Sequence, residues 1–302
     1  MTYASANVVI VGLGLIGGSL ARALRSSGFS QRFIGYGHRE ASLQRGLELG
    51  VIDEFTLDLD EAIERADIVV VCTPTLTTVQ MLEKILPRLR GRAEGPVVTD
   101  VASVKGNLRN AAIEIAGTMP PQLVLGHPIA GSERSGVNAS DGELFVNHRV
   151  ILTPDAANDP AAVELVRAMW RSAGADVVDM TVEQHDAVLA STSHLPHVLA
   201  YTLVDALASA DNSEDIFRCA AGGFRDFTRI ASSDPAMWRD IAIANKSALL
   251  DSIDLFSDHL AQLRQAVQDE NADELFNTFD RAKQARNAFA TLLAQRIQPK
   301  SS

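Results

Sequence analysis

The sequence of residues 7–20 is NVVIVGLGLIGGSL, an apolar run followed by closely spaced glycines. The run is rich in β-branched residues and ends at Gly12, which predicts a buried strand that enters a tight turn. Gly12, Gly14 and Gly17 have the G-x-G-x-x-G spacing, and a helical pattern begins directly after them. The first glycine permits the turn, the second lets a pyrophosphate approach the backbone, and the third lets helix and strand pack closely. The stretch therefore predicts a dinucleotide site at a helix N-terminus, with contacts from Gly12, Gly14, Leu15, Ile16 and Gly17.

The end of the second predicted strand, residues 32–37, indicates which dinucleotide is bound. An NAD site usually has an Asp or Glu here, about twenty residues after the glycines, to bind the ribose hydroxyls. In this sequence His38 and Arg39 follow the strand instead. Without a carboxylate nothing repels a 2′-phosphate, and the guanidinium of Arg39 can bind one. We predict NADP as the preferred cofactor; the alternative is a solvated Arg39 and an NAD site served by Glu40.

Strand and helix patterns alternate up to about residue 181, and only helical patterns follow. Short apolar runs such as ADIVVVCTP (residues 66–74) alternate with amphipathic stretches, which is typical of a parallel sheet covered on both faces. We predict an α/β Rossmann-type dinucleotide-binding domain over residues 1–181 and an all-α domain over residues 182–302. Apolar residues recur at helical spacing from Leu275 to Leu293, and we expect this stripe to pack in a core. A helical domain this apolar often also buries surface against a second subunit.

Composition and charge exclude several classes of protein. The 302 residues have a formal net charge of −11, which argues against nucleic acid or an anionic membrane as a partner. No apolar stretch approaches the roughly 20 residues of a membrane span, and no basic segment precedes the first apolar run as in a signal peptide. Cys72 and Cys219 form no disulfide framework, so a cytoplasmic location is expected.

Polar residues follow several of the predicted strands. In an open α/β sheet, ligands bind beyond the carboxyl ends of the strands. These ends carry Thr73 and Pro74, which we place beside the cofactor, then the stretch 100–105, and then His127 within LGHPIAGSERSG (residues 125–136). The convergence of these residues predicts a site where a nicotinamide and its substrate meet.

Three interpretations of His127 are open. A metal ligand would need partners at ligand spacing, and none lies nearby, so no metal site is predicted. A structural histidine is the second interpretation. As a general base, His127 would accept the proton released when a hydroxyl is oxidised to a carbonyl, a task that suits its near-neutral pKa. Ser103, at the neighbouring strand end, could hydrogen-bond the imidazole and select its tautomer.

Five motifs follow one another between residue 8 and about residue 246: VGLGLIGGS, TDVASVKG, GHPIAGSERSG, HDAVLASTSHLPH and GGFRDFTRIASSDPAMWRDI. As an ordered set they resemble the prephenate/arogenate dehydrogenase family of tyrosine biosynthesis. The resemblance implies a Rossmann-type domain followed by a helical dimerisation domain, and hence a homodimer. It also implies oxidative decarboxylation of a cyclohexadienol with hydride transfer to NAD(P).

The resemblance further implies roles for individual residues. His127 would accept the proton of the ring hydroxyl, Ser103 would hydrogen-bond His127, and Arg229 would hold the substrate carboxylate. The other residues expected at the substrate site are His197, Ser132, Arg225 and His185. A bidentate guanidinium suits a carboxylate, although Arg229 could instead form a surface ion pair with Asp226.

Some questions stay open at this stage. Pro196 is expected to bend its helix and turn His197 inward. Glu133 could gate the pocket or face solvent, and His194 could be a pocket or a core residue. The choice between prephenate and arogenate and the presence of feedback by tyrosine are not decided by these residues.

Two rival functions are considered. β-Hydroxyacid dehydrogenases also join a Rossmann domain to a helical domain, but they use a lysine on a glycine-rich helix, and Lys246 lacks those glycines. A non-catalytic NADP-binding regulatory protein would keep the glycine turn. It would have no need for Ser103, His127 and Arg229 together.

Overall fold

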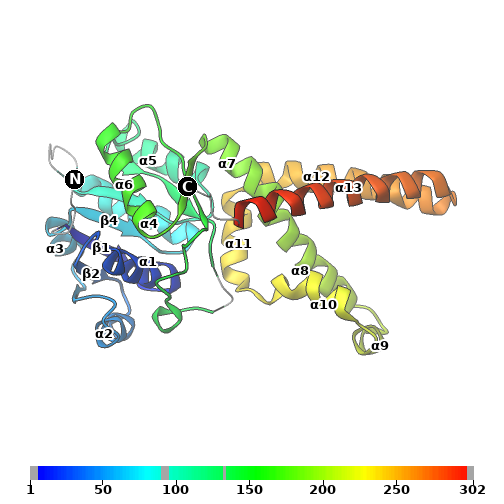
Figure 1. The fold of residues 1–302 in the computed structure, drawn as a ribbon, viewed down its shortest axis with the longest axis horizontal. Helices are drawn as coiled ribbons and strands as arrows, with labels where there is room; N and C mark the ends of the chain where they lie inside the picture. The colour runs from blue at the N-terminus through cyan, green and yellow to red at the C-terminus, as the bar shows by residue number, and fades with distance from the viewer. Residues whose placement is uncertain (1–5, 90–94, 132–133, 298–302) are drawn as a thin grey trace. The chain divides into compact units, whose positions relative to one another are not determined.

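The structure is a computed structural model that describes residues 6–89, 95–131 and 134–297 (Figure 1). The chain forms two compact units, Met1–Leu249 and Leu250–Ser302. Every described strand belongs to the first unit, and the described part of the second unit is helical. The boundary predicted at residue 181 remains a prediction.

The first unit is built on a six-stranded parallel sheet with the order β3-β2-β1-β4-β5-β6. Its strands are β1 (Asn7–Val11), β2 (Arg32–Tyr36), β3 (Glu54–Thr56), β4 (Ile68–Val71), β5 (Val97–Asp100) and β6 (Leu123–Val124). Along β1, Val8 and Ile10 belong to one buried apolar cluster, and Val9 and Val11 belong to another. Burial on both faces explains the continuous apolar runs. The order reverses direction between β1 and β4, which is where dinucleotides bind in sheets of this order.

Helices cover both faces of this sheet. Helices α1 (Leu15–Ser26), α2 (Glu40–Glu48) and α6 (Pro160–Ser172) contribute to one apolar cluster. Helices α3 (Leu59–Glu64), α4 (Thr75–Leu89) and α5 (Gly106–Ala116) contribute to the other. This three-layer arrangement confirms the predicted α/β Rossmann-type fold.

The stretch that leads to His127 is divided between two sheets. After β6 the chain forms the first strand of a smaller sheet with the order β7-β8-β9, in which β7 is antiparallel to β8 and β8 is parallel to β9. The elements are β7 (Gly126–Pro128), the short 3₁₀ turn η1 (Val137–Ala139), β8 (Arg149–Leu152) and β9 (Asp176–Asp179). The division falls at Gly126, whose N–H is bound by Asp100 and whose carbonyl is bound by Lys105.

The rest of the first unit is helical, as the pattern predicts. Its elements are α7 (Val182–Leu189), the π-helical turn η2 (Ala190–His194), α8 (Leu195–Ala208), α9 (Ser213–Arg218), α10 (Gly222–Thr228), the 3₁₀ turn η3 (Arg229–Ser232) and α11 (Pro235–Ala244). Asp234 caps α11, because its side chain accepts the N–H groups of Ala236 and Met237. Instead of one bent helix around Pro196, the chain forms the η2 turn and then a new helix. Proline suits this first helical turn, because it has no N–H to donate.

The second unit contains most of α12 (Lys246–Gln268) and α13 (Ala272–Ile297), which are joined by a turn at Glu270 with a positive φ of 52°. The expectation that the apolar stripe of α13 packs in a core is wrong for the single chain: Phe279, Phe289, Leu292 and Leu293 are exposed. Two helices without a further layer leave their outer faces uncovered. Among the described residues no helix is long and apolar enough to cross a membrane.

Candidate active site

The glycine turn lies between β1 and α1, and each of its glycines has a different surrounding. Gly12 has a φ of +91°, and a Cβ added there would lie 2.9 Å from the carbonyl oxygen of Cys72. At Gly17 an added Cβ would lie 2.7 Å from Cγ2 of Ile10, so glycine lets α1 approach β1 closely. At Gly14 no atom would lie within 4 Å of the added Cβ, so this side of the turn is open. The turn has the features that a pyrophosphate site requires.

The start of α1 has backbone donors to offer. Gly14 is the N-cap, no side chain caps the helix, and its first turn has no acidic residue. Within the described residues, the N–H groups of Leu15, Ile16 and Gly17 therefore have no side-chain acceptor, and the helix dipole favours an anion beside them. These residues fit the phosphates of a dinucleotide.

The ends of β2 and β4 flank the turn. The N–H of Gly12 donates to the carbonyl of Tyr36, the last residue of β2, at 2.9 Å. His38 and Arg39 follow and are exposed, and within the described residues the Arg39 guanidinium has no hydrogen bond or ion pair. On the other side, a Cβ added at Gly12 would lie 2.9 Å from Cγ2 of Thr73, the residue before Pro74. The structure thus gathers the predicted cofactor residues around one turn.

His127 lies in β7 with only 9% of its surface exposed. Its Nδ1 is 2.9 Å from Nε2 of His185 on α7. Burial, and then the neighbouring His185, Lys105 and His194, hold the pKa of His127 well below its ordinary range. The ring is therefore neutral near pH 7, which is the form that can accept a proton.

Asp186 holds His185 from the other side. Nδ1 of His185 lies 2.7 Å from Oδ1 of Asp186, and the Asp186 carboxylate also accepts the N–H groups of Lys105 and Gly106. Burial raises the pKa of Asp186, but these three hydrogen bonds outweigh it and lower the pKa below its usual value. Asp186 is therefore ionised.

A buried ion pair between Lys105 and Asp100 holds the backbone that precedes His127. Both side chains are fully buried. The Lys105 ammonium contacts Asp100 and donates to the carbonyl of Gly126 at 2.7 Å, while Asp100 accepts the N–H groups of Gly126 and Ala102. Burial lowers the pKa of Lys105, and the charge of Asp100 opposes this shift. The two bonds to Gly126 fix the residue that precedes His127.

A second cluster of rings lies near His185 and contains His194, His197 and Trp238. His194 is buried, with its Nδ1 3.1 Å from Nδ2 of Asn245, and its ring is 6.2 Å from that of Trp238. His197 also belongs to this cluster: its ring stacks on that of Trp238, and the two centroids are 3.5 Å apart. Burial lowers the pKa of His194 to about 4.

Arg229 lies at the far end of this cluster. Burial lowers the pKa of His197, and the positive charge of Arg229 lowers it further, so the two side chains are neighbours. Arg229 is exposed and begins η3. Arg225, one helical turn earlier, is also exposed and pairs with Asp226 at 3.1 Å. Asp226 thus has Arg225 as an ion-pair partner.

The structure does not join Ser103 to His127. Ser103 is half-buried in the loop after β5, and within the described residues no hydrogen bond connects the two side chains. Its assigned role stays a prediction. Ser132 and Glu133 lie outside the described residues.

Sequence reasoning missed several residues of the site. Asp186 directly follows a predicted site histidine, and this adjacency is the one signal that could have found it. Nothing in the sequence distinguishes the buried Lys105 from a solvated lysine. Trp238 and Asn245 come from the end of the last motif and just beyond, and only the fold brings them to His194.

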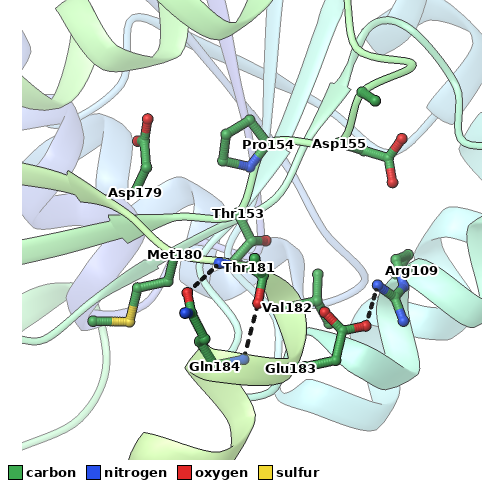
Figure 2. A pocket seen from close by; sticks show the side chains of 11 residues that line it. Arg109, Thr153, Pro154, Asp155, Asp179, Met180, Thr181, Val182, Glu183 and Gln184 are labelled. Carbon is green, nitrogen blue, oxygen red and sulfur yellow. Dashed lines mark hydrogen bonds and ion pairs between the residues drawn. The ribbon is translucent and has the colours of Figure 1, made fainter.

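A separate pocket of about 500 Å³ lies where β8 and β9 end (Figure 2). Its lining residues are Arg109, Thr153, Pro154, Asp155, Ala156, Asp179, Met180, Thr181, Val182, Glu183 and Gln184. Thr181 already caps α7 in a reciprocal capping box with Gln184, and Glu183 pairs with Arg109 at 2.6 Å. With the helix start capped and carboxylates in the wall, this pocket does not suit a phosphate. None of the predicted site residues lines it.

Comparison with known proteins identifies the family. Two family models match, "Prephenate dehydrogenase, nucleotide-binding domain" over residues 20–179 and "Prephenate dehydrogenase, dimerization domain" over residues 181–281. The prephenate dehydrogenase of Bacillus subtilis is 38% identical over 93% of this chain and 75% of its own length. The cyclohexadienyl dehydrogenase of Zymomonas mobilis is 35% identical over 94% of this chain and 96% of its own length.

A solved structure agrees with these matches. The crystal structure of prephenate dehydrogenase from A. aeolicus, in complex with hydroxyphenyl propionate and NAD+, has a TM-score of 0.87 and 38% identity, and covers 96% of this chain and 100% of that one. The family predicted from the five motifs is confirmed, and neither rival function gains support over it. The chain belongs to the prephenate dehydrogenase family of NAD(P)-dependent dehydrogenases.

Proposed function

We propose that this protein oxidises and decarboxylates prephenate or arogenate, with His127 as the general base and NADP as the preferred cofactor. The observation that carries the proposal is the buried, neutral His127, held in β7 next to the dinucleotide-binding sheet. A histidine in this state suits the removal of a hydroxyl proton in a chain of this family.

The chemistry balances with one base and one hydride acceptor. His127 takes the proton of the ring hydroxyl while the hydrogen on the same carbon leaves as hydride, which a bound nicotinamide would accept. The bond to the ring carboxylate then breaks, CO₂ leaves, and its electron pair makes the ring aromatic. The new phenolate oxygen takes back the proton from His127. The base is thus regenerated in each turnover.

Substrate binding is assigned to the residues around the second ring cluster. Arg229 would bind the substrate carboxylate through a bidentate guanidinium, in a protein whose overall charge repels anions. His197 stacks on Trp238, lies near Arg229, and would line the pocket with Ser132, His185 and Arg225. Ser103 would act beside His127 from the end of β5.

The cofactor assignment rests on the glycine turn and on Arg39. Gly12, Gly14, Leu15, Ile16 and Gly17 would hold the pyrophosphate, with Thr73, Pro74 and His38 close by. The guanidinium of Arg39, which has no partner in the described part of the chain and lies next to the end of β2, favours a 2′-phosphate and hence NADP.

We also propose that the protein is a cytoplasmic homodimer. The second unit exposes large apolar side chains on both helices, among them Leu255, Phe276 and Phe279. Surfaces of this kind are typical of subunit interfaces. Cys72 and Cys219 are unpaired, which fits a reducing compartment.

The test is the formation of reduced cofactor by purified protein, with prephenate and arogenate each combined with NAD and with NADP. Turnover in any combination supports the reaction, and the fastest combination identifies the substrate and cofactor. If all four are inactive while cofactor still binds, the proposed reaction is wrong. In the same assay Arg39→Ala should raise the KM for NADP about tenfold and leave that for NAD nearly unchanged. Equal effects on both would refute the NADP assignment.

A further inference from the structure

A chain of hydrogen bonds runs from His127 to the start of α5. Nδ1 of His127 lies 2.9 Å from Nε2 of His185, and Nδ1 of His185 lies 2.7 Å from Oδ1 of Asp186. The carboxylate of Asp186 accepts the backbone N–H groups of Lys105 at 2.9 Å and of Gly106 at 2.8 Å. His185 is fully buried, and the Asp186 side chain is 14% exposed. The chain therefore lies almost entirely out of solvent.

The direction of each hydrogen bond follows from Asp186. An ionised carboxylate can only accept, so Nδ1 of His185 must carry a proton and donate it. Burial lowers the pKa of His185, so its ring is neutral, and Nε2 then has a lone pair and accepts. Nδ1 of His127 is the donor to that lone pair. A neutral His127 consequently has its own lone pair on Nε2.

We propose that His185 and Asp186 are positioning residues that hold His127 in the tautomer with a free lone pair on Nε2, the atom that accepts the substrate proton. The inference rests on the proposed function, since it names the atom and the supporting residues of the same base. Once Nε2 has taken the proton, the acceptor nitrogen of His185 and the negative charge of Asp186 stabilise the imidazolium. Without this support His127 would distribute its proton over both nitrogens, and only one of its neutral forms could act as the base.

The backbone around Asp186 leaves space for its carboxylate and donates hydrogen bonds to it. A Cβ added at Gly106 would lie 2.7 Å from Oδ2 of Asp186, so a side chain there would displace the carboxylate. Helix α5 has Lys105 at its N-cap and no side-chain cap from that residue, and Asp186 supplies acceptors from another helix. Asn245 in turn donates to the carbonyl oxygen of Asp186 at 2.9 Å. These contacts orient Asp186 before any substrate binds.

The first test needs no turnover. Protein labelled with nitrogen isotope in its histidines is measured by NMR, and the His127 signals are assigned by their loss in His127→Asn. We expect a protonated Nδ1 and a bare Nε2 at neutral pH. A proton on Nε2 in the unmodified protein would overturn the inference, whatever the protein does to prephenate or arogenate.

The second test compares two replacements of His185. His185→Phe removes the acceptor, and we expect kcat to fall about a hundredfold, a larger change than that in KM or in cofactor affinity. His185→Gln offers a carbonyl oxygen to Nδ1 of His127, so its kcat should be about tenfold higher than that of His185→Phe. His148→Gln, a replacement of an exposed histidine in the loop before β8, serves as the matched control and should keep full activity.

The outcomes separate this inference from the proposed function. Equal losses in the Phe and Gln variants, or a loss confined to KM, would show that His185 fills space and does not set the tautomer. An unmodified protein that is inactive toward both substrates would refute the reaction, while the NMR result would still decide the tautomer of His127.

Discussion

The two ends of the proposed substrate site are built in opposite ways. At the base end, His127, His185 and Lys105 are buried, and each is held by a hydrogen bond or an ion pair. At the carboxylate end, Arg225 and Arg229 are exposed on α10 and η3. A buried polar group must have its partners in place when the protein folds, whereas an interaction of an exposed guanidinium is screened by water and holds the side chain less firmly. The difference separates a buried, preorganised centre for chemistry from a solvent-exposed binding surface.

The contrast between the two ends first predicts that replacing the base lowers kcat and leaves cofactor binding unchanged. His127→Asn should lower kcat by about a thousandfold, because the amide cannot accept a proton at neutral pH. Cofactor affinity, measured by calorimetric titration, should stay the same, since the glycine turn is untouched. An active His127→Asn variant would remove His127 from the role of base.

The second prediction concerns the stability of the base end. Lys105→Met should reduce the free energy of unfolding by about 3–5 kcal/mol, because it leaves the buried charge of Asp100 without its partner. The double variant Asp100→Asn/Lys105→Met should lose less than Lys105→Met alone. Lys84→Met, on the exposed side of α4, is the matched control and should change stability by less than about 0.5 kcal/mol. Urea unfolding measures all three variants; a double variant that loses as much stability as Lys105→Met, or more, would contradict the coupling.

Third, the buried histidines make the stability of the first unit depend on pH. Burial lowers the pKa of His194 from 6.5 to about 4 and also lowers those of His127 and His185. The unfolded chain thus binds protons below pH 6.5 that the folded chain does not, so stability is full above that pH and is lost as pH falls toward 4. For His194 the loss is on the order of 3 kcal/mol.

The free energy of unfolding, measured between pH 6.5 and pH 4, tests whether stability falls on acidification. His194→Gln, which does not titrate, should give a flatter profile than the unmodified protein. A protein that gains stability on acidification, or an unchanged slope in the variant, would contradict the prediction.

The smallest effects are expected at the exposed end. Arg229→Ala should raise the KM for the substrate about 10- to 100-fold and leave kcat within about threefold, because a lost charged hydrogen-bond pair weakens binding by about 1.5–3 kcal/mol. Arg225→Ala should raise KM only about threefold, since its guanidinium already pairs with Asp226 in solvent. Steady-state kinetics decides between them, and an unchanged KM in Arg229→Ala would remove it from the carboxylate site.

Much of the fold could be predicted because its signals are local. The apolar runs, the glycine spacing before α1 and the Asp-Pro start of α11 each act within a few residues. Local reasoning failed where partners come from distant segments. The chain leaves the large sheet at Gly126 because Asp100 and Lys105 hold it there, and no nearby residue signals that change.

The same division holds for the site. The sequence by itself determined the dinucleotide turn, the family, and the choice of His127 and Arg229 as candidates, because these depend on residue type and spacing. Only the tertiary structure decided that Nδ1 of His127 faces His185, which is 58 positions away in the sequence. It also decided that Asp186 binds the other nitrogen of His185. It also decided that Lys105 is buried, since burial depends on what packs around a side chain. Which ring nitrogen of His127 is free follows from that packing, because a hydrogen bond is directional and the partner of this strand residue lies on α7.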